Sequence, residues 1–152
     1  MFDWLANPRR FKKITDKLES LLMVISLLLI IFGLYFSLFD SPVDYQQGDA
    51  VRIMYVHVPS AWLASFLYLS LAISCIFYLV WKHPLADLIS SSIAPIGVLF
   101  SLLTLITGSL WGKPMWGTWW VWDARLTSML ILFFFYLGFI LLHDAFERKV
   151  DG

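Results

Sequence analysis

The sequence predicts an all-α membrane protein, a polytopic bundle of four transmembrane helices. Of its 152 residues, 60% are hydrophobic and 14% are charged, whereas soluble domains have about 45–50% apolar and about 25% charged residues. The apolar excess is concentrated in four runs that contain no Asp, Glu, Lys or Arg. Because about 20 apolar residues cross a bilayer, and hydrocarbon forces the backbone to hydrogen-bond within its own segment, each run is expected to be a helix.

The expected spans follow one another with short connections, so the whole chain is interpreted as one membrane domain. The fourth span is the shortest, but it is still within the tolerated length of about 17–25 residues. A transmembrane barrel would show strands that alternate apolar and polar residues, a pattern absent from this sequence. The expected spans are residues 20–39, 56–81, 88–111 and 126–142, with a tryptophan-rich outer interfacial loop at 112–125, in a single domain of residues 1–152.

The charged residues outside the spans predict the orientation of the chain in the membrane. A basic N-terminal tail is expected to stay in the cytoplasm, and an even number of spans then places both termini inside. The loop at 40–52, with three acids and one base, and the loop at 112–125 are then expected outside. The first run is longer than the roughly 7–15 apolar residues of a cleaved signal peptide, so it is expected to remain as an anchor. The basic residues of the tail are Arg9, Arg10, Lys12, Lys13 and Lys17.

The second and third spans are expected to be antiparallel neighbours, because the inner loop at 82–87 is short. The second span is expected to open at His57 and Pro59, with the proline in the first helical turn, where its missing amide hydrogen has no partner. In the third span, Pro95 and Gly97 permit a kink. Hydroxyl side chains give this span small surfaces for close helix contact, at Ser90, Ser91, Ser92, Ser101, Thr104 and Thr107.

Five of the eight tryptophans fall within twelve residues, between the third and fourth spans. An aromatic belt at the membrane surface explains one or two tryptophans per helix end, and this interpretation suffices for Trp62, Trp81 and Trp111. It explains poorly the four that lie within seven residues. A dense aromatic cluster closed by an acid and an Arg indicates instead a flat apolar ligand with charged edges, such as a haem with its two carboxylates. The four are Trp116, Trp119, Trp120 and Trp122.

The segment after Pro114 is expected to present these rings as a shelf at the membrane surface. Ring faces suit a porphyrin plane, because aromatic pairs contribute about 0.5–1.5 kcal/mol beyond area burial. Arg125 and Lys113 are candidates to bind the haem carboxylates, Arg125 being the better because its fork matches a carboxylate. Asp123 cannot do so, and is expected either to pair with Arg125 or to cap the fourth helix. If the segment is helical, one face carries Trp116, Trp119, Trp120, Asp123 and Thr127, and a second carries Trp122 and Arg125.

The three histidines are candidate iron ligands, since imidazole is a common axial ligand of haem. His83 and His143 are expected at inner helix ends, where a solvated role suffices. His57 is the one histidine expected on the outer side, with the tryptophan cluster, and it is therefore the candidate metal ligand. The alternative is an ordinary histidine at the membrane surface.

Several function classes are disfavoured by what the chain lacks. The single cysteine, Cys75, falls within a span, so the chain has no Cys-x-x-Cys redox pair. A net charge of zero gives no indication of nucleic-acid binding. A proton-coupled antiporter needs an ionisable group inside the membrane, and the four spans contain no acid, Lys or Arg. A structural subunit of a transporter complex, whose tryptophans form a protein–protein surface, remains the alternative to a haem-handling protein.

The tryptophan segment and four further motifs resemble a known family. Residues 116–128 (WGTWWVWDARLTS) are similar to the tryptophan-rich signature of haem-handling membrane proteins. The other motifs narrow the resemblance to the haem exporter protein C family of bacterial cytochrome c maturation. They are residues 45–48 (YQQG), 55–59 (YVHVP), 94–97 (APIG) and 107–115 (TGSLWGKPM).

The resemblance implies a multi-pass protein of the bacterial inner membrane that is not an ordinary enzyme. Such a protein binds haem b (iron protoporphyrin IX) at the periplasmic face and delivers it to a periplasmic haem chaperone during c-type cytochrome biogenesis. The resemblance implies that His57 is one axial ligand and that residues 119–125 hold the haem edge. It further implies three partners: the subunits of an ATP-binding cassette transporter, a small one-helix membrane protein and the chaperone.

The resemblance also implies six spans, with a second haem-ligating histidine in an outer loop between the fifth and sixth. Only four spans are expected here, and no residue matches that histidine. The last two spans and the second ligand are therefore expected outside these 152 residues, in a longer or split protein, or the second ligand comes from elsewhere in a shortened one.

Overall fold

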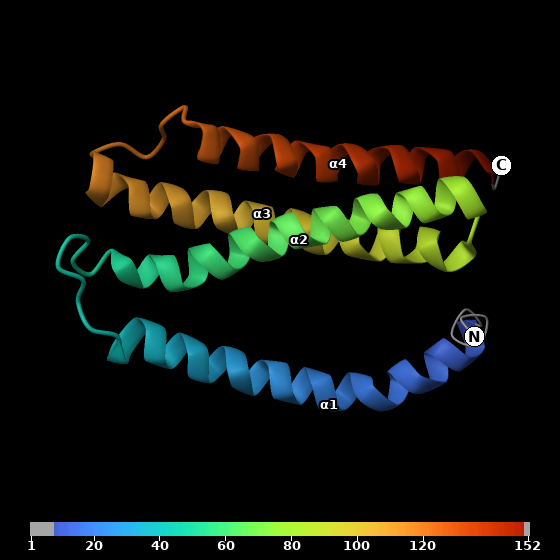
Figure 1. Cartoon of the computed structure of the whole chain (residues 1–152), viewed down its shortest axis with the longest axis horizontal. Helices are drawn as coiled ribbons and strands as arrows, with labels where there is room; N and C mark the ends of the chain where they lie inside the picture. Colours follow the sequence, from blue (N-terminus) through green and yellow to red (C-terminus); the bar gives the residue numbers. More distant parts are fainter. Residues whose placement is uncertain (1–7, 151–152) are drawn as a thin grey trace. The chain divides into compact units, whose positions relative to one another are not determined.

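Four long helices account for most of the chain (Figure 1). The structure, a computed structural model, describes the backbone of residues 8–150 and the side chains of residues 12, 14–16 and 18–146. Among the described residues, four helices are long and apolar enough to cross a membrane, which confirms the predicted all-α class with four spans. The predicted orientation stays a prediction, and most basic side chains of the tail lie outside the described residues: Arg9, Arg10, Lys13 and Lys17.

Contacts divide the chain into two compact units, Met1–Pro42 and Val43–Gly152, so the single domain expected from the sequence stays a prediction. The first unit contains α1 (Pro8–Tyr35), which continues into a π-helical turn, η2 (Phe36–Asp40). None of the most apolar window within Leu18–Asp40 is buried. A helix that is apolar around its whole circumference suits a lipid environment.

The second unit consists of α2 (Val51–Trp81), α3 (Pro84–Trp116) and α4 (Ala124–Val150). In Figure 1 these three helices run alongside one another, and α3 contacts both of the others. A tight connection joins α2 to α3, because Lys82 adopts a left-handed conformation (φ 51°) and donates its N–H to the Tyr78 carbonyl. The predicted antiparallel pairing of the second and third spans is therefore confirmed.

The expectation that the second span opens at Pro59 was wrong. The helix begins at Val51, and Pro59 lies inside it. The loop before it is already folded: Asp44 Oδ1 accepts the backbone N–H groups of Gln46 and Gln47 at 2.8 Å each, a local turn that leads directly into a helix. Arg52 in the first turn is half-buried, and its charge is paired with Asp49 at 3.5 Å.

The buried face of α3 is a stripe of mostly small residues. It includes Ser90, Ser101, Thr104 and Thr107 as the sequence predicts, but the expectation was wrong for Ser91 and Ser92, which are not buried. Each buried hydroxyl group of the stripe donates to a backbone carbonyl one turn earlier, as Ser101 Oγ does to Gly97 O at 2.8 Å. None of these hydroxyl groups is therefore left without a partner. The stripe consists of Ala86, Ser90, Ala94, Gly97, Ser101, Thr104, Leu105, Thr107, Gly108 and Gly112. This surface lets α2 and α4 approach α3 closely.

The core of the three-helix unit is centred on Tyr136 of α4. Tyr136 is fully buried with Ala94 and Leu71, and its hydroxyl donates to the Ala64 carbonyl of α2 at 2.7 Å. A Cβ on Gly97 would lie 2.1 Å from the Tyr136 ring, so only glycine fits there. One aromatic side chain thus joins all three helices at their middle.

Candidate functional site

The predicted site residues gather at one end of the three-helix unit, where α2 begins, α3 ends and α4 begins; we call it the tryptophan end. The loop before α2 is fixed to it. Trp111 Nε1 on α3 donates to Gln47 Oε1 at 2.8 Å, and Gly48 closes the loop in a left-handed conformation (φ 58°). The loop therefore braces Trp111, the first of the five clustered tryptophans.

The expectation of one helical shelf after Pro114 was wrong. α3 continues through Pro114 but ends at Trp116, because Gly117 adopts φ 75° and donates its N–H to the Lys113 carbonyl at 3.1 Å. Such a left-handed glycine is a common helix terminator. Residues 117–123 are not helical, so the tryptophans do not share a face by helical spacing. The predicted outer loop at 112–125 is reduced to these seven residues.

Asp123 fulfils both roles that the sequence left open. Its Oδ1 accepts the Leu126 N–H at 2.9 Å and so caps α4, while its Oδ2 lies 2.8 Å from an Arg125 guanidinium nitrogen. These hydrogen bonds, the backbone one foremost and that from Arg125 second, hold the pKa of the Asp123 carboxyl below its ordinary value of 3.8. The carboxylate therefore stays charged and keeps Arg125 in place.

Arg125 stands over the Trp116 ring, its guanidinium carbon 5.3 Å from the ring centroid, a favourable cation–π position. Trp116 in turn packs edge-on against Trp111, with centroids 5.0 Å apart. Although Arg125 Nε and one terminal nitrogen face Asp123, its side chain is 75% exposed. Because a guanidinium has five N–H donors, it retains donors for an external carboxylate.

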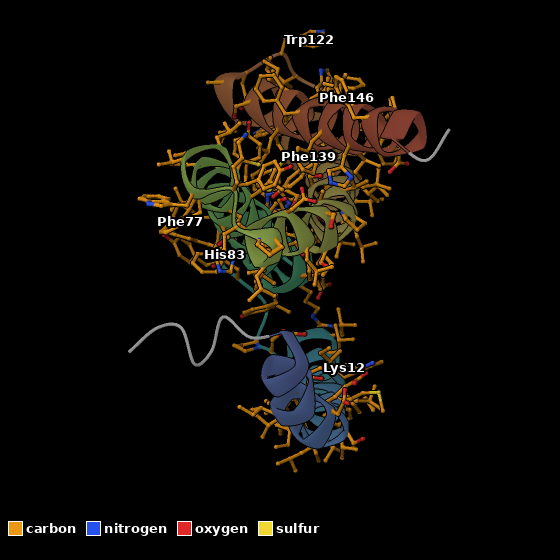
Figure 2. The ribbon with its side chains drawn as sticks, turned by 90° about the vertical axis from the view of Figure 1, so that its right-hand side faces the viewer. Lys12, Phe77, His83, Trp122, Phe139 and Phe146 are labelled. Carbon is orange, nitrogen blue, oxygen red and sulfur yellow. The ribbon has the colours of Figure 1, made fainter. Side chains whose placement is uncertain are left out.

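Trp119 and Trp122 are more exposed than Trp116, whereas Trp120 is partly buried. The ring of Trp119 is 5.7 Å from the Lys113 ammonium, which also donates to the Gly117 carbonyl at 3.0 Å. Trp120 and Trp122 form an edge-to-face pair with centroids 5.4 Å apart. Trp119 is 54% and Trp122 76% exposed, and Trp122 projects away from the helices (Figure 2).

The indole N–H of Trp120 is a buried donor without an acceptor. Its Nε1 is enclosed, yet it has no hydrogen-bond partner among the described residues. Buried polar groups in native structures are nearly always paired.

His57 lies near the start of α2, half-buried against α3. Its Nδ1 is 3.0 Å from Thr107 Oγ1. A Cβ on Gly108 would lie 3.1 Å from the His57 ring and 3.3 Å from Leu126. The imidazole therefore packs against α3 at Gly108, close to Leu126, whose backbone N–H is capped by Asp123.

The same face of α3 leads from His57 to the tryptophans. Gly112 follows Gly108 by four residues, about 6 Å along the helix axis. A Cβ on Gly112 would lie 3.3 Å from the Trp116 ring and 3.4 Å from the Thr118 carbonyl. The structure thus brings His57, Trp116, Arg125 and Asp123 to the same end of the three-helix unit.

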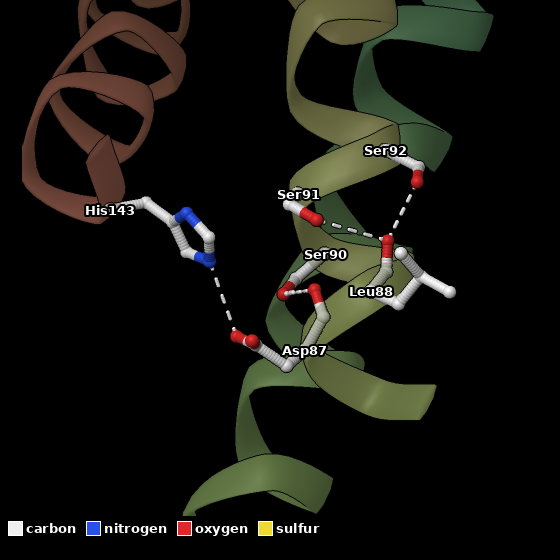
Figure 3. Close-up of polar contacts among 6 residues, drawn as sticks. All are labelled: Asp87, Leu88, Ser90, Ser91, Ser92 and His143. Carbon is white, nitrogen blue, oxygen red and sulfur yellow. Dashed lines mark hydrogen bonds and ion pairs between the residues drawn. The ribbon is translucent and has the colours of Figure 1, made fainter. Parts of the chain in front are cut away.

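The other two histidines lie at the opposite end, as predicted, and both have structural roles there. His83 caps α3, its Nδ1 accepting the Leu85 N–H at 3.3 Å. On α4, the Nε2 atom of His143 is 3.2 Å from Oδ1 of Asp87 on α3 (Figure 3). Two cavities, of about 230 and about 200 Å³, lie on either side of this pair and share Phe139 as a wall.

Three residues position the site through contacts that the sequence does not reveal. Thr107 is expected only as a small packing residue, and Gly108 and Gln47 appear only within the family motifs at 107–115 and 45–48. For Thr107 and Gly108 a signal existed: they continue the stripe of small residues along α3 into the tryptophan segment. No sequence signal pairs Gln47 with Trp111.

The comparisons with known proteins agree with the resemblance noted above. The model of the family described as "Heme exporter protein C" matches residues 1–152. The chain is 51% identical over 147 residues to "Heme exporter protein C" of Bradyrhizobium diazoefficiens, and 50% identical over 155 residues to the protein of that name from Haemophilus influenzae. It is 49% identical over 138 residues to a "Putative cytochrome c biosynthesis ccmC-like mitochondrial protein" of Marchantia polymorpha.

These alignments cover nearly all of this chain but only part of each relative. They include 97%, 100% and 91% of the chain, and 54%, 63% and 60% of the respective relatives. The chain therefore spans rather more than half the length of the proteins it matches.

Proposed function

The chain belongs to the haem exporter protein C family, and from that premise we propose that its tryptophan end binds haem b for c-type cytochrome biogenesis. One observation carries the proposal: a half-buried His57 lies at the same end as exposed tryptophan faces and a largely exposed Arg125. A haem needs an axial imidazole, apolar surface and donors for two carboxylates, and this end offers all three.

Each residue has a distinct part in the proposal. His57 supplies one axial imidazole. The exposed faces of Trp119 and Trp122 pack on the porphyrin, and Trp120 supports Trp122 through their edge-to-face contact. Arg125 and Lys113 bind the propionates, Arg125 through the donors that Asp123 leaves free.

The proposal extends to location and partners. The tryptophan end faces the periplasm from a bacterial inner membrane, because the basic residues that precede the apolar span Leu18–Asp40 favour a cytoplasmic N-terminus. The haem is handed to a periplasmic chaperone, and the chain works with the subunits of an ATP-binding cassette transporter and a small one-helix membrane protein. The protein binds and transfers its cargo, and it is not an ordinary enzyme.

Haem binding is tested with the purified protein in detergent, titrated with haemin and followed by the Soret band. We expect a saturable band that His57→Ala reduces by more than tenfold in affinity. The matched control is His83→Asn, which removes an imidazole at the opposite end while retaining a residue suited to capping α3. An unchanged band in His57→Ala, or no band in any variant, would favour a structural subunit instead.

The orientation is tested by cysteine accessibility. In a Cys75→Ser background, Thr118→Cys is expected to react with a membrane-impermeant maleimide in intact spheroplasts, and Lys82→Cys only after permeabilisation. The reverse pattern would place the tryptophan end in the cytoplasm and exclude delivery to a periplasmic chaperone.

A further inference from the structure

The contact between His57 and Thr107 constrains the imidazole more tightly than packing alone. His57 Nδ1 on α2 lies 3.0 Å from Thr107 Oγ1 on α3, and Thr107 is 8% exposed. A hydroxyl can both donate and accept, so the distance alone does not say which atom carries the proton.

The other contacts of the hydroxyl favour one direction for this hydrogen bond. Thr107 Oγ1 is 2.7 Å from the Leu103 carbonyl and 3.2 Å from the Thr104 carbonyl. Carbonyl oxygens only accept, so both contacts use the hydroxyl proton of Thr107. With that proton directed to the backbone, Thr107 Oγ1 is an acceptor toward His57, and His57 Nδ1 is the donor. In a neutral imidazole, Nε2 then has no proton and a free lone pair.

Gly108 holds the ring in this position. Its missing side chain leaves room for the Nδ1–Cε1 edge, since a Cβ there would lie 3.1 Å from Cε1 and 3.6 Å from Nδ1. The edge that carries Nδ1 therefore faces α3. The backbone carbonyl of Thr104 is a second acceptor within hydrogen-bonding reach of the His57 ring, so α3 offers this imidazole acceptors only.

We propose that Thr107 is a positioning residue that holds His57 in the tautomer with its proton on Nδ1, so that Nε2 is the atom that binds iron. The role of Nε2 depends on the proposed haem site, whereas the tautomer does not. Histidines that bind metals commonly donate their second N–H to an acceptor that fixes tautomer and ring orientation. Here a buried threonine hydroxyl, with its proton already engaged by the helix backbone, is that acceptor.

Three variants separate this role from packing. Thr107→Val keeps the shape of the side chain but removes the acceptor, and Thr107→Ser restores it. The matched control is Thr104→Val, because Thr104 is buried one turn earlier on α3 and its hydroxyl bonds only to the Phe100 carbonyl at 2.8 Å. It removes a hydroxyl from the same stripe and leaves in place the Thr104 backbone carbonyl, which is the group of Thr104 that bonds to His57.

The first measurement uses the protein without haem. With ¹⁵N-labelled histidine at about pH 8.5, where imidazole is neutral, the His57 signals are identified by their absence in His57→Asn. We expect Nδ1 to be protonated in the wild type, Thr107→Ser and Thr104→Val, and a mixture of both tautomers in Thr107→Val. The same tautomer in Thr107→Val as in the wild type would overturn the proposal.

The second measurement is the haemin titration. Loss of such an acceptor typically lowers metal affinity by about 10–100-fold, so Thr107→Val is expected to weaken haem binding by that factor while Thr107→Ser and Thr104→Val match the wild type. Equal weakening in Thr104→Val would mean that packing is responsible and would refute the positioning role. If the wild type itself bound no haem, the proposed function would fail. The tautomer measurement would still test whether Thr107 fixes the proton of His57 on Nδ1.

Discussion

Two histidines lie at opposite ends of the same three helices, and their partners differ in kind. His57, at the tryptophan end, contacts a neutral hydroxyl whose proton is already bonded to the backbone of α3. His143, at the opposite end, contacts the Asp87 carboxylate through Nε2, and its ring also lies 5.7 Å from that of Phe139. The first contact orients an imidazole, and the second joins α4 to α3.

The difference indicates how the same side chain is adapted to binding or to assembly. A carboxylate stabilises a charged imidazolium and engages it in an ion pair, whereas a hydroxyl acceptor leaves a neutral ring with one nitrogen available. The surroundings agree with this: exposed tryptophans and Arg125 accompany His57, whereas a helix cap and two small cavities accompany His143. We therefore treat the tryptophan end as the binding end and the opposite end as structural.

The largest expected effect tests whether the two ends depend on a common centre. Gly97→Ala would place a methyl group 2.1 Å from the Tyr136 ring, and overpacking of this kind typically costs about 1–3 kcal/mol. We expect the free energy of unfolding, measured in detergent by tryptophan fluorescence, to fall by about 1–3 kcal/mol. Haem binding should be lost in parallel. Gly138→Ala on α4 is the control, since nothing lies within 4 Å of that Cβ. Equal stability of the two variants would contradict the central role of Tyr136.

A second pair of changes compares how helices terminate at the two ends. α2 and α3 each end at a left-handed residue that bonds back to a carbonyl, but that residue is Lys82 at one end and Gly117 at the other. A side chain in this conformation costs about 1–2 kcal/mol. Gly117→Ala is therefore expected to lower, and Lys82→Gly to raise, the free energy of unfolding by about that amount. Shifts of the same sign in the two variants would show that backbone conformation is not the cause.

The sequence predicted the four helices correctly because long apolar runs permit no other backbone structure in hydrocarbon. It misplaced two helix ends that local turns determine. α2 already begins at Val51, after the turn that Asp44 forms. α3 ends at Trp116, because the next residue, Gly117, has a positive φ. The residue types of the site were accessible, since Trp, Arg and His are chemically distinctive. Contacts between distant segments, such as His57 with Thr107, depend on which faces of α2 and α3 meet, and neither spacing nor composition specifies that.

The pair at the structural end is expected to contribute modestly to stability and nothing to haem affinity. The side chains of His143 and Asp87 are 18% and 39% exposed, and partly exposed ion pairs contribute about 0.2–1 kcal/mol. A double-mutant cycle with Asp87→Asn and His143→Gln, measured by unfolding in detergent, should give a coupling energy in that range. The haemin titrations of all three variants should match the wild type. A clear loss of haem affinity would remove the distinction between the two ends.

The smallest expected effect concerns the carboxylate that orders the binding end. Because the pKa of Asp123 is lowered in the folded protein, below 3.8, the unfolded chain takes up the proton first as the pH falls. The stabilisation by Asp123 is complete well above pH 3.8, declines as the pH falls through the ordinary pKa, and is lost once the folded carboxyl is also protonated. Asp123→Asn keeps a capping side chain but cannot titrate, so its unfolding free energy should fall less steeply between about pH 5 and about pH 3. Parallel pH profiles of wild type and Asp123→Asn would show that the cap acts through its hydrogen bond alone, and that its charge does not hold Arg125 over Trp116.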